Sequence, residues 1–152
     1  MAHVELSLTE SFVPHVLPDE QLSPAGPGTL QRWSAVVREA VEPSLVIDAR
    51  ETIIGVSAAC CELLGLGDPA AAVGRSLLDD VRLIDFTANQ GELTEPEMAN
   101  IPPLLAVTSG RLARGLLRVL RLGQPPSTVD AISTPLRDGD DVAGSLTFFA
   151  EV

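Results

Sequence analysis

The sequence predicts an α+β fold, in which short helices cover one face of a five-stranded antiparallel sheet and an amphipathic helix precedes the sheet. Two strand-like apolar runs occur within residues 45–56, and three more follow residue 115. Helical patterns bounded by Gly and Pro lie between the two groups. With 152 residues, of which 45% are hydrophobic, the chain can form one packed domain and an arm.

The first part of the chain divides into an arm and a helix. Residues 1–28 contain four prolines among scattered polar residues, and this density of proline disfavours helices and strands. From Thr29 onward, apolar residues recur at helical spacing until Pro43. We therefore expect a proline-rich arm over residues 1–28 and an amphipathic helix over residues 29–42, with Thr29 as its N-cap.

A hairpin and a short helix are predicted next. Residues 45–47 are a β-branched apolar run, residues 48–51 have the composition of a turn, and residues 52–56 form a second strand. Ser57 is a suitable N-cap for a helix over residues 58–64.

The middle of the chain is less regular. A helical turn is expected over residues 68–74, where Asp-Pro supplies an N-cap and a proline at the first helical position. Residues 77–84 are interpreted as a short helix and residues 85–100 as a polar loop. The two prolines at 102 and 103 suit the start of a longer helix that runs to about residue 114.

Three strands end the chain, over residues 116–122, 128–134 and 142–151. The connector over residues 135–141 contains Asp-Gly, a strong hairpin signal. Alternation along the last strand predicts that its core face carries Val142, Gly144, Leu146, Phe148 and Ala150, whereas Phe149 lies on the opposite face.

The order and spacing of several short motifs over residues 33–152 resemble a PAS domain. The motifs are Leu45-Val46-Ile47-Asp48, the helix from Ser57 to Gly65, Val73-Gly74-Arg75-Ser76-Leu77, and Pro135-Leu136-Arg137-Asp138-Gly139 followed by Val142-Ala143-Gly144-Ser145-Leu146. One departure is Ser57, where the family often has Asn, although Ser caps a helix equally well. The resemblance implies a PAS domain over residues 43–152 and a sensory or regulatory role.

Composition excludes several functions. The chain has a net charge of −11 and no Lys, which argues against nucleic acid or an anionic membrane as a partner. The two histidines, His3 and His15, lie in the arm, so the domain cannot pair a nucleophile with His. The acidic pairs at residues 79–80 and 138–141 suit helix ends and turns. We expect no enzyme and no catalytic residue.

The residues at the positions that would hold a cofactor argue against haem and flavin. Haem-binding PAS domains typically use a His on the long helix before the third strand, and residues 101–114 contain none. Light-sensing members carry a reactive Cys that corresponds to residues 78–86, which contain none. Cys60 shares a helix face with Leu63 and Leu64, so we interpret it as a buried apolar side chain, and no metal site is expected.

Adjacent cysteines and the absence of a targeting or membrane segment predict a cytoplasmic protein. The all-Arg basic residues and abundant Ala and Leu suggest a stand-alone bacterial, actinobacterial source. Two functional hypotheses remain open: a sensor that holds a small apolar ligand in its core, and a pure interaction or dimerisation module with a filled core. In both, output passes through a signalling protein partner or a homodimer.

The candidate ligand-pocket residues are Ile47, Val56, Cys60, Leu64, Leu105, Thr108, Val119, Arg121, Ile132, Leu146 and Phe148. Arg121 is placed at the pocket rim, where it would meet a carboxylate or phosphate. It belongs to a group of Arg111, Arg114, Arg118 and Arg121, which forms either a patch for an acidic partner or a solvated strand border. The candidate interface residues are Leu30, Trp33, Val37, Ala40 and Phe149, with packing of the helix within one chain as the alternative.

Overall fold

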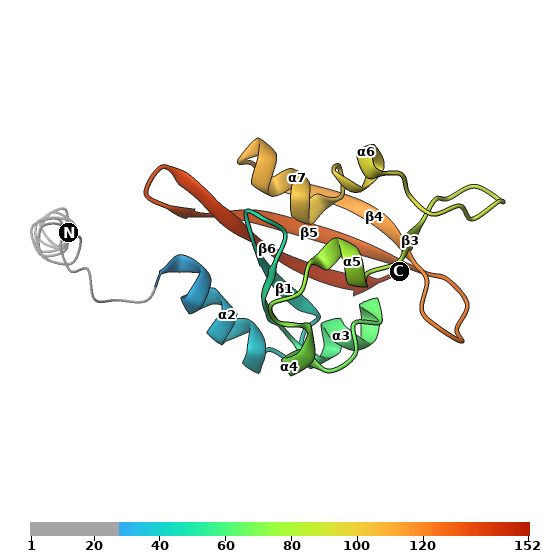
Figure 1. Ribbon diagram of the computed structural model, residues 1–152, viewed down its shortest axis with the longest axis horizontal. Helices are drawn as coiled ribbons and strands as arrows, with labels where there is room; N and C mark the ends of the chain where they lie inside the picture. Colours follow the sequence, from blue (N-terminus) through green and yellow to red (C-terminus); the bar gives the residue numbers. More distant parts are fainter. Residues whose placement is uncertain (1–27) are drawn as a thin grey trace, which may run out of the picture.

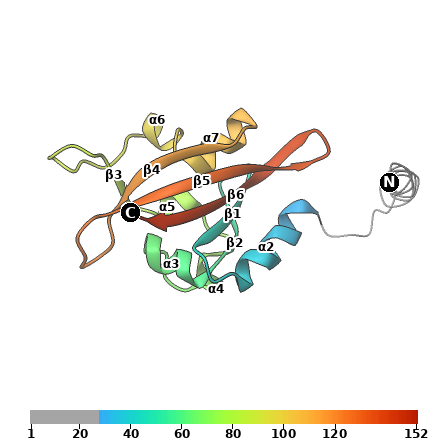
Figure 2. The same cartoon turned by 180° about the vertical axis from the view of Figure 1, so that it is seen from behind.

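The computed structural model describes residues 28–152, so the predicted proline-rich arm lies outside the described residues except for Gly28. An antiparallel sheet with the strand order β2-β1-β6-β5-β4-β3 forms the centre of the molecule (Figures 1 and 2). In chain order the elements are α2 (Thr29–Glu39), β1 (Ser44–Asp48), β2 (Ile53–Val56), α3 (Ala58–Leu64), α4 (Pro69–Ala72), α5 (Leu77–Asp80), β3 (Leu83–Ile84), α6 (Glu95–Met98), α7 (Pro102–Ser109), β4 (Ala113–Val119), β5 (Ser127–Asp138) and β6 (Asp141–Glu151). The predicted α+β class is confirmed.

The turn between β1 and β2 forms as predicted. One oxygen of Asp48, Oδ1, accepts hydrogen bonds from the amides of Arg50 and Thr52, at 2.8 and 2.9 Å. Such local bonds from an Asp side chain are why Asp is favoured in turns. Glu51 completes the turn with a φ of 71°, in the left-handed region.

The predicted N-cap of α3 is also confirmed. The Ser57 hydroxyl accepts from the Cys60 amide at 3.1 Å and from the Ser44 amide at 3.0 Å, and it donates to the Glu42 carbonyl at 2.9 Å. The same hydroxyl therefore starts the helix and ties it to the first residue of β1. At the other end, Gly65 ends the helix with a φ of 72°.

The structure adds a sixth strand that the sequence pattern did not predict. The helix expected over residues 77–84 covers only α5, and Leu83 and Ile84 pair instead with Val119 and Arg118 of β4. A two-residue strand has no measurable period, and its formation depends on a partner far along the chain. The expected loop over residues 85–100 contains α6, which begins with a capping box between Thr94 and Glu97.

Two predicted boundaries near β4 and β5 are wrong. Helix α7 ends at Gly110, which has a φ of 67°, so Ala113 and Arg114 belong to β4 rather than to the helix. The connector predicted over residues 135–141 is mostly strand, because β5 continues through Pro135 to Asp138. Pro135 is tolerated there because its missing N–H would point toward the β4 side of the strand. The pairing of β5 with β4 does not extend beyond Ser133, which lies opposite Ala113, so no ladder bond is lost.

The face assignment of β6 is inverted relative to the prediction. Phe149 points into the main core, and Leu146 points to the opposite face of the sheet, where it packs with Val37. The inner face of β6 carries Ser145 and Thr147, which a simple alternation rule assigns to solvent. Both are fully buried, because the Ser145 hydroxyl donates to the Pro103 carbonyl at 2.8 Å and the Thr147 and Ser133 hydroxyls lie 2.6 Å apart.

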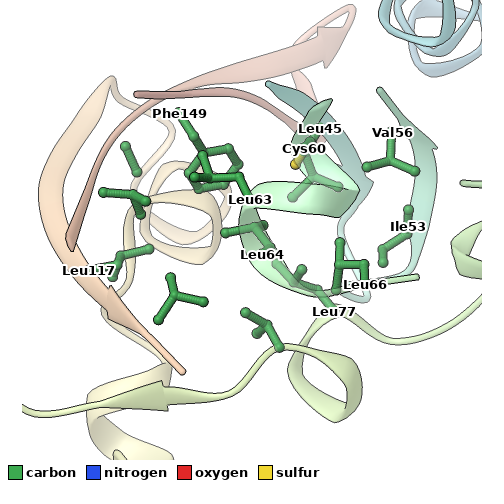
Figure 3. Packing of buried hydrophobic residues seen from close by; sticks show 14 of the residues in the cluster. Leu45, Ile53, Val56, Cys60, Leu63, Leu64, Leu66, Leu77, Leu117 and Phe149 are labelled. Carbon is green, nitrogen blue, oxygen red and sulfur yellow. The ribbon is translucent and has the colours of Figure 1, made fainter. Parts of the chain in front are cut away.

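The main core fills the space between the inner face of the sheet and the helices α3, α4, α5 and α7. Its aliphatic side chains and Phe149 converge around α3, as Figure 3 shows. The figure labels Leu45, Ile53, Val56, Cys60, Leu63, Leu64, Leu66, Leu77, Leu117 and Phe149. The core is built mainly from aliphatic residues, in a chain with only 3% aromatic residues.

Helix α2 packs on the outer face of the sheet. Val37 is buried there against Val46, Leu136 and Leu146. The helix approaches β2 so closely that a Cβ at Gly55 would lie 2.6 Å from the Ser34 Cβ. It ends at Glu39 rather than at residue 42, and its N-cap is Gly28 rather than Thr29.

An acidic side chain from the β5–β6 hairpin supplies the missing cap of α2. Asp138 Oδ1 accepts from the Thr29 amide at 3.2 Å and lies 2.6 Å from the Thr29 hydroxyl. These bonds hold the pKa of Asp138 below its usual range, the hydroxyl contributing more than the amide. The start of α2 is therefore tied to the tip of the hairpin.

Candidate functional site

Five of the eleven predicted ligand-pocket residues lie in the main core. Each of them is at most 3% exposed and belongs to the main core cluster; they are Ile47, Val56, Cys60, Leu64 and Val119. Figure 3 labels Val56, Cys60 and Leu64 among the core side chains. Side chains at this packing density leave little room for a ligand. The positions of these five residues are those of core side chains, and Ile47 also borders a small cavity.

The remaining pocket candidates are scattered. Thr108 lies with Ile47 at a cavity of about 90 Å³ between α7 and the β1–β2 turn. Leu105 is half-exposed on the other side of α7. Ile132 and Phe148 face outward from the sheet, and Leu146 packs beneath α2, so the structure does not bring the eleven predicted residues together.

Arg121 has a different position from the predicted pocket rim. It follows the end of β4, so the strand alternation that placed it beside Leu117 and Val119 does not reach it. Its Nη1 donates to the Glu62 carbonyl at 3.1 Å, near the C-terminus of α3, and its side-chain carbons pack over Gly65. A cation at a helix C-terminus stabilises the exposed carbonyls, so this contact is structural.

The two thiols are unsuited to nucleophilic chemistry. Cys60 and Cys61 are both buried. Burial raises the pKa of each thiol, most strongly that of Cys60. Since the thiolate is the reactive species, both side chains behave as small apolar groups.

The acidic pairs act in local structure. Asp80 forms an ion pair with Arg75 at 2.7 Å, and Asp138 caps α2. Within residues 28–152, no three His, Cys, Asp or Glu side chains gather as metal ligands would. The described helices also include none that is long and apolar enough to cross a membrane.

A groove with a volume of about 720 Å³ runs between α5, β3 and α6. We name it the α5–α6 groove. Its lining includes apolar side chains that are partly buried against the core. It also includes acidic residues, of which Glu92 pairs with Arg82 at 3.0 Å. The lining residues are Glu51, Ser76, Leu78, Asp79, Val81, Arg82, Leu83, Glu92, Leu93, Glu95, Met98, Ala99 and Leu104.

The α5–α6 groove was missed from sequence because its residues come from the segments with the weakest patterns. Leu83 lies in the unpredicted strand β3, and Met98 in the unpredicted helix α6. The one available signal was the pair Thr94 and Glu97, whose spacing is that of a capping box.

A second surface lies on the outer face of the sheet, which is turned toward the viewer in Figure 2. Leu116, Ile132 and Phe148 of β4, β5 and β6 point outward there and are between 36% and 53% exposed. Ile132 and Phe148 are cross-strand partners. Trp33 on α2 is also partly exposed, and we name these four residues the outer patch.

Of the predicted interface residues, Trp33 alone keeps a substantially exposed side chain. Val37 is buried against the outer face of its own chain, and Leu30 packs on the same cluster. Ala40 is half-buried. Phe149 belongs to the main core, because the two faces of β6 are inverted relative to the prediction.

Comparisons with known proteins agree with this architecture. The family model described as the PAS fold matches residues 31–103, from α2 to the start of α7. No curated protein sequence matches the chain. The PAS domain of a protein from Colwellia psychrerythraea is similar at 14% identity with a TM-score of 0.56, over 81% of this chain and 96% of that one.

Two further structures show the same likeness. The PAS domain of an HTR-like protein from Haloarcula marismortui is 15% identical, with a TM-score of 0.51 over 99% of this chain and 98% of that one. The VqmA dimer of Vibrio cholerae is 14% identical, with a TM-score of 0.56 over 80% of this chain and 50% of that one. At such low identity these likenesses establish the fold alone.

Proposed function

Because the chain contains a PAS domain, we propose that it is a non-catalytic regulatory module that acts by self-association through the outer patch. The observation that carries the proposal is the group of outward, partly exposed side chains Leu116, Ile132 and Phe148, with Trp33 of α2 also partly exposed. Apolar side chains that gather on one face of a sheet and stay partly exposed mark protein–protein contacts in water. Aromatic side chains, here Phe148 and Trp33, are the residue type that most often anchors such contacts.

The rest of the domain supports a non-catalytic role. Residues 28–152 contain no His, and the two thiols are buried. The proposal accordingly includes no haem bound through histidine and no flavin bound through cysteine. The VqmA structure with a similar fold is described as a dimer, and a two-fold arrangement of two copies is the default symmetry for this chain as well.

The test is the oligomeric state of the full chain by light scattering. We expect a dimer that becomes a monomer when Phe148→Glu places a charge in the outer patch. Leu122→Glu is the matched control, since Leu122 is 95% exposed on the β4–β5 turn away from the patch. A native chain that is monomeric at all accessible concentrations contradicts the proposal, as does a Phe148→Glu variant that stays dimeric.

A second candidate function is the binding of a small amphipathic molecule in the α5–α6 groove. Its volume of about 720 Å³ and its mixture of apolar floor and acidic border support this alternative. Native mass spectrometry of protein purified from its own host tests it, because a retained ligand adds mass. Met98→Trp, which fills the groove, should abolish that added mass.

A further inference from the structure

The α5–α6 groove lies on the outside of the main core, and part of its lining is apolar. Leu78, Leu93 and Met98 line it and are partly buried against the core, while Leu104 of α7 lines it and is buried. A volume of about 720 Å³ is within the range of sites that hold small organic molecules. The groove therefore offers apolar contacts to the body of such a molecule.

A second, smaller space adjoins the groove. Glu51, Ala99 and Leu104 line both the groove and the cavity of about 90 Å³ between α7 and the β1–β2 turn. Ile47 and Val107 border that cavity as well, so apolar surface continues from the groove toward the sheet. Glu51 belongs to both linings and is half-buried.

The border of the groove carries more negative than positive charge. Four carboxylates line it against one guanidinium; they are Glu51, Asp79, Glu92 and Glu95, with Arg82. Arg82 pairs with Glu92 at 3.0 Å, which leaves three carboxylates. None of the ion pairs formed within residues 28–152 includes Glu51, Asp79 or Glu95.

The charged residues beside the lining do not reverse this balance. Arg75 is held by Asp80 at 2.7 Å, and Glu97 is engaged in the capping box of α6. Arg50 is exposed and does not line the groove, and Asp48 adds a further carboxylate at the smaller cavity. The groove thus has an acidic border without a matching cation.

The three carboxylates come from three separate elements. Glu51 lies in the β1–β2 turn, Asp79 in α5, and Glu95 at the start of α6. Carboxylates gathered around one groove repel an anion and attract a cation, and water screens this effect less where the groove is partly enclosed. A positive group on an apolar body therefore matches both the border and the apolar lining.

We propose that the α5–α6 groove binds a small cationic amphipathic molecule, with its ammonium or guanidinium group among Glu51, Asp79 and Glu95 and its apolar body against Leu93 and Met98. The inference rests on the second candidate function, to which it adds the charge of the ligand. It does not depend on self-association, because the outer patch lies on the outer face of the sheet.

Three probes with the same apolar chain test the charge of the ligand: octylammonium, octan-1-ol and octanoate at neutral pH. The chain has two methionines, Met1 and Met98, so in protein labelled at the methionine methyl groups the Met98 signal is identified by its loss in Met98→Leu. We expect octylammonium to shift this signal saturably and to bind at least about tenfold more tightly than octanoate, with octan-1-ol between them.

The variant Glu51→Gln/Asp79→Asn/Glu95→Gln removes the three charges with little change in shape. It should bind octylammonium and octanoate within about threefold of each other. It should bind octan-1-ol as the native chain does, which shows that the groove is still formed. The matched control, Glu39→Gln/Asp140→Asn/Glu151→Gln, removes three exposed carboxylates that do not line the groove and should keep the native preference.

Equal affinity of the native chain for octylammonium and octanoate would overturn the inference and leave the second candidate function in place, because the groove would then bind apolar molecules of any charge. A preference that the control variant loses as fully would also overturn it, since the net charge of the whole chain would then be the cause. A Met98 signal that none of the three probes shifts would contradict both the inference and the second candidate function.

Discussion

The two faces of the sheet differ in how they are covered. The inner face is sealed by four helices, and its buried Ser133 and Thr147 hydroxyls are hydrogen-bonded to each other. The outer face is covered by α2 over β1 and β2 but leaves Ile132 and Phe148 partly exposed. Adjacent residues of one strand therefore have different roles: Phe149 stabilises the fold, and Phe148 is free to meet a partner.

The largest effect should separate these two phenylalanines. Phe149→Ala removes a buried ring from the main core and should lower the free energy of unfolding by about 3–5 kcal/mol. Phe148→Ala should lower it by less than about 1 kcal/mol in the monomer, since the ring is half-exposed. Urea denaturation measures both values, and equal losses would mean that the two faces are not distinguished as described.

The docking of α2 is broken most directly at Gly55. A Cβ there collides with Ser34, so Gly55→Ala should cost about 1–3 kcal/mol and move the helix away from β2. Fluorescence of Trp33, the one tryptophan of the chain, reports that movement as a red shift. Gly115→Ala is the control, because the added Cβ meets its nearest atom, in Pro102, at an ordinary 3.4 Å.

Hydrogen bonding on the inner face is tested by two threonines. Thr147→Val removes the hydroxyl that bonds Ser133 and should cost about 1–2 kcal/mol, because a buried hydroxyl loses its partner. Thr134→Val alters an exposed residue of the outer face and should be close to neutral. If both changes have the same effect on the unfolding midpoint, the inner hydroxyl pair does not stabilise the fold.

The smallest effect concerns pH at the outer face. Because the pKa of Asp138 is lowered in the folded chain, its bond to Thr29 stabilises the fold above the unfolded pKa of about 3.9. That contribution is lost as the pH falls through the folded pKa. The difference in thermal midpoint between the native chain and Asp138→Asn should therefore be present at neutral pH and shrink below about pH 4.

Local signals predicted the parts of the fold that local interactions build. Asp48 forms its turn and Ser57 its cap because both bond within a few residues of the chain. The sixth strand and the α5–α6 groove were missed because Leu83 needs Val119 as its partner, and no local pattern contains that information.

The prediction of which face of β6 points into the core was wrong for a different reason. Apolar residues occur on both of its faces, since Leu146 packs under α2 and Phe149 packs over α3, so alternation alone could not choose between them. Helix α7 fixes which face points inward, because its Pro103 carbonyl accepts a hydrogen bond from the buried Ser145 hydroxyl. This inversion misplaced the β6 candidates Leu146, Phe148 and Phe149, whereas five of the predicted pocket residues lie together in the main core.

The contacts of Arg137 have a mechanical consequence. Its carbonyl lies against Thr29 at the start of α2, and its guanidinium holds the Gly110 carbonyl at the end of α7 and the Asp140 carbonyl of the hairpin. Helices on opposite faces of the sheet are thus fastened to one residue at the tip of one hairpin. A tilt of that hairpin moves the ends of both helices together, so the two layers are linked around the rim of the sheet rather than through it.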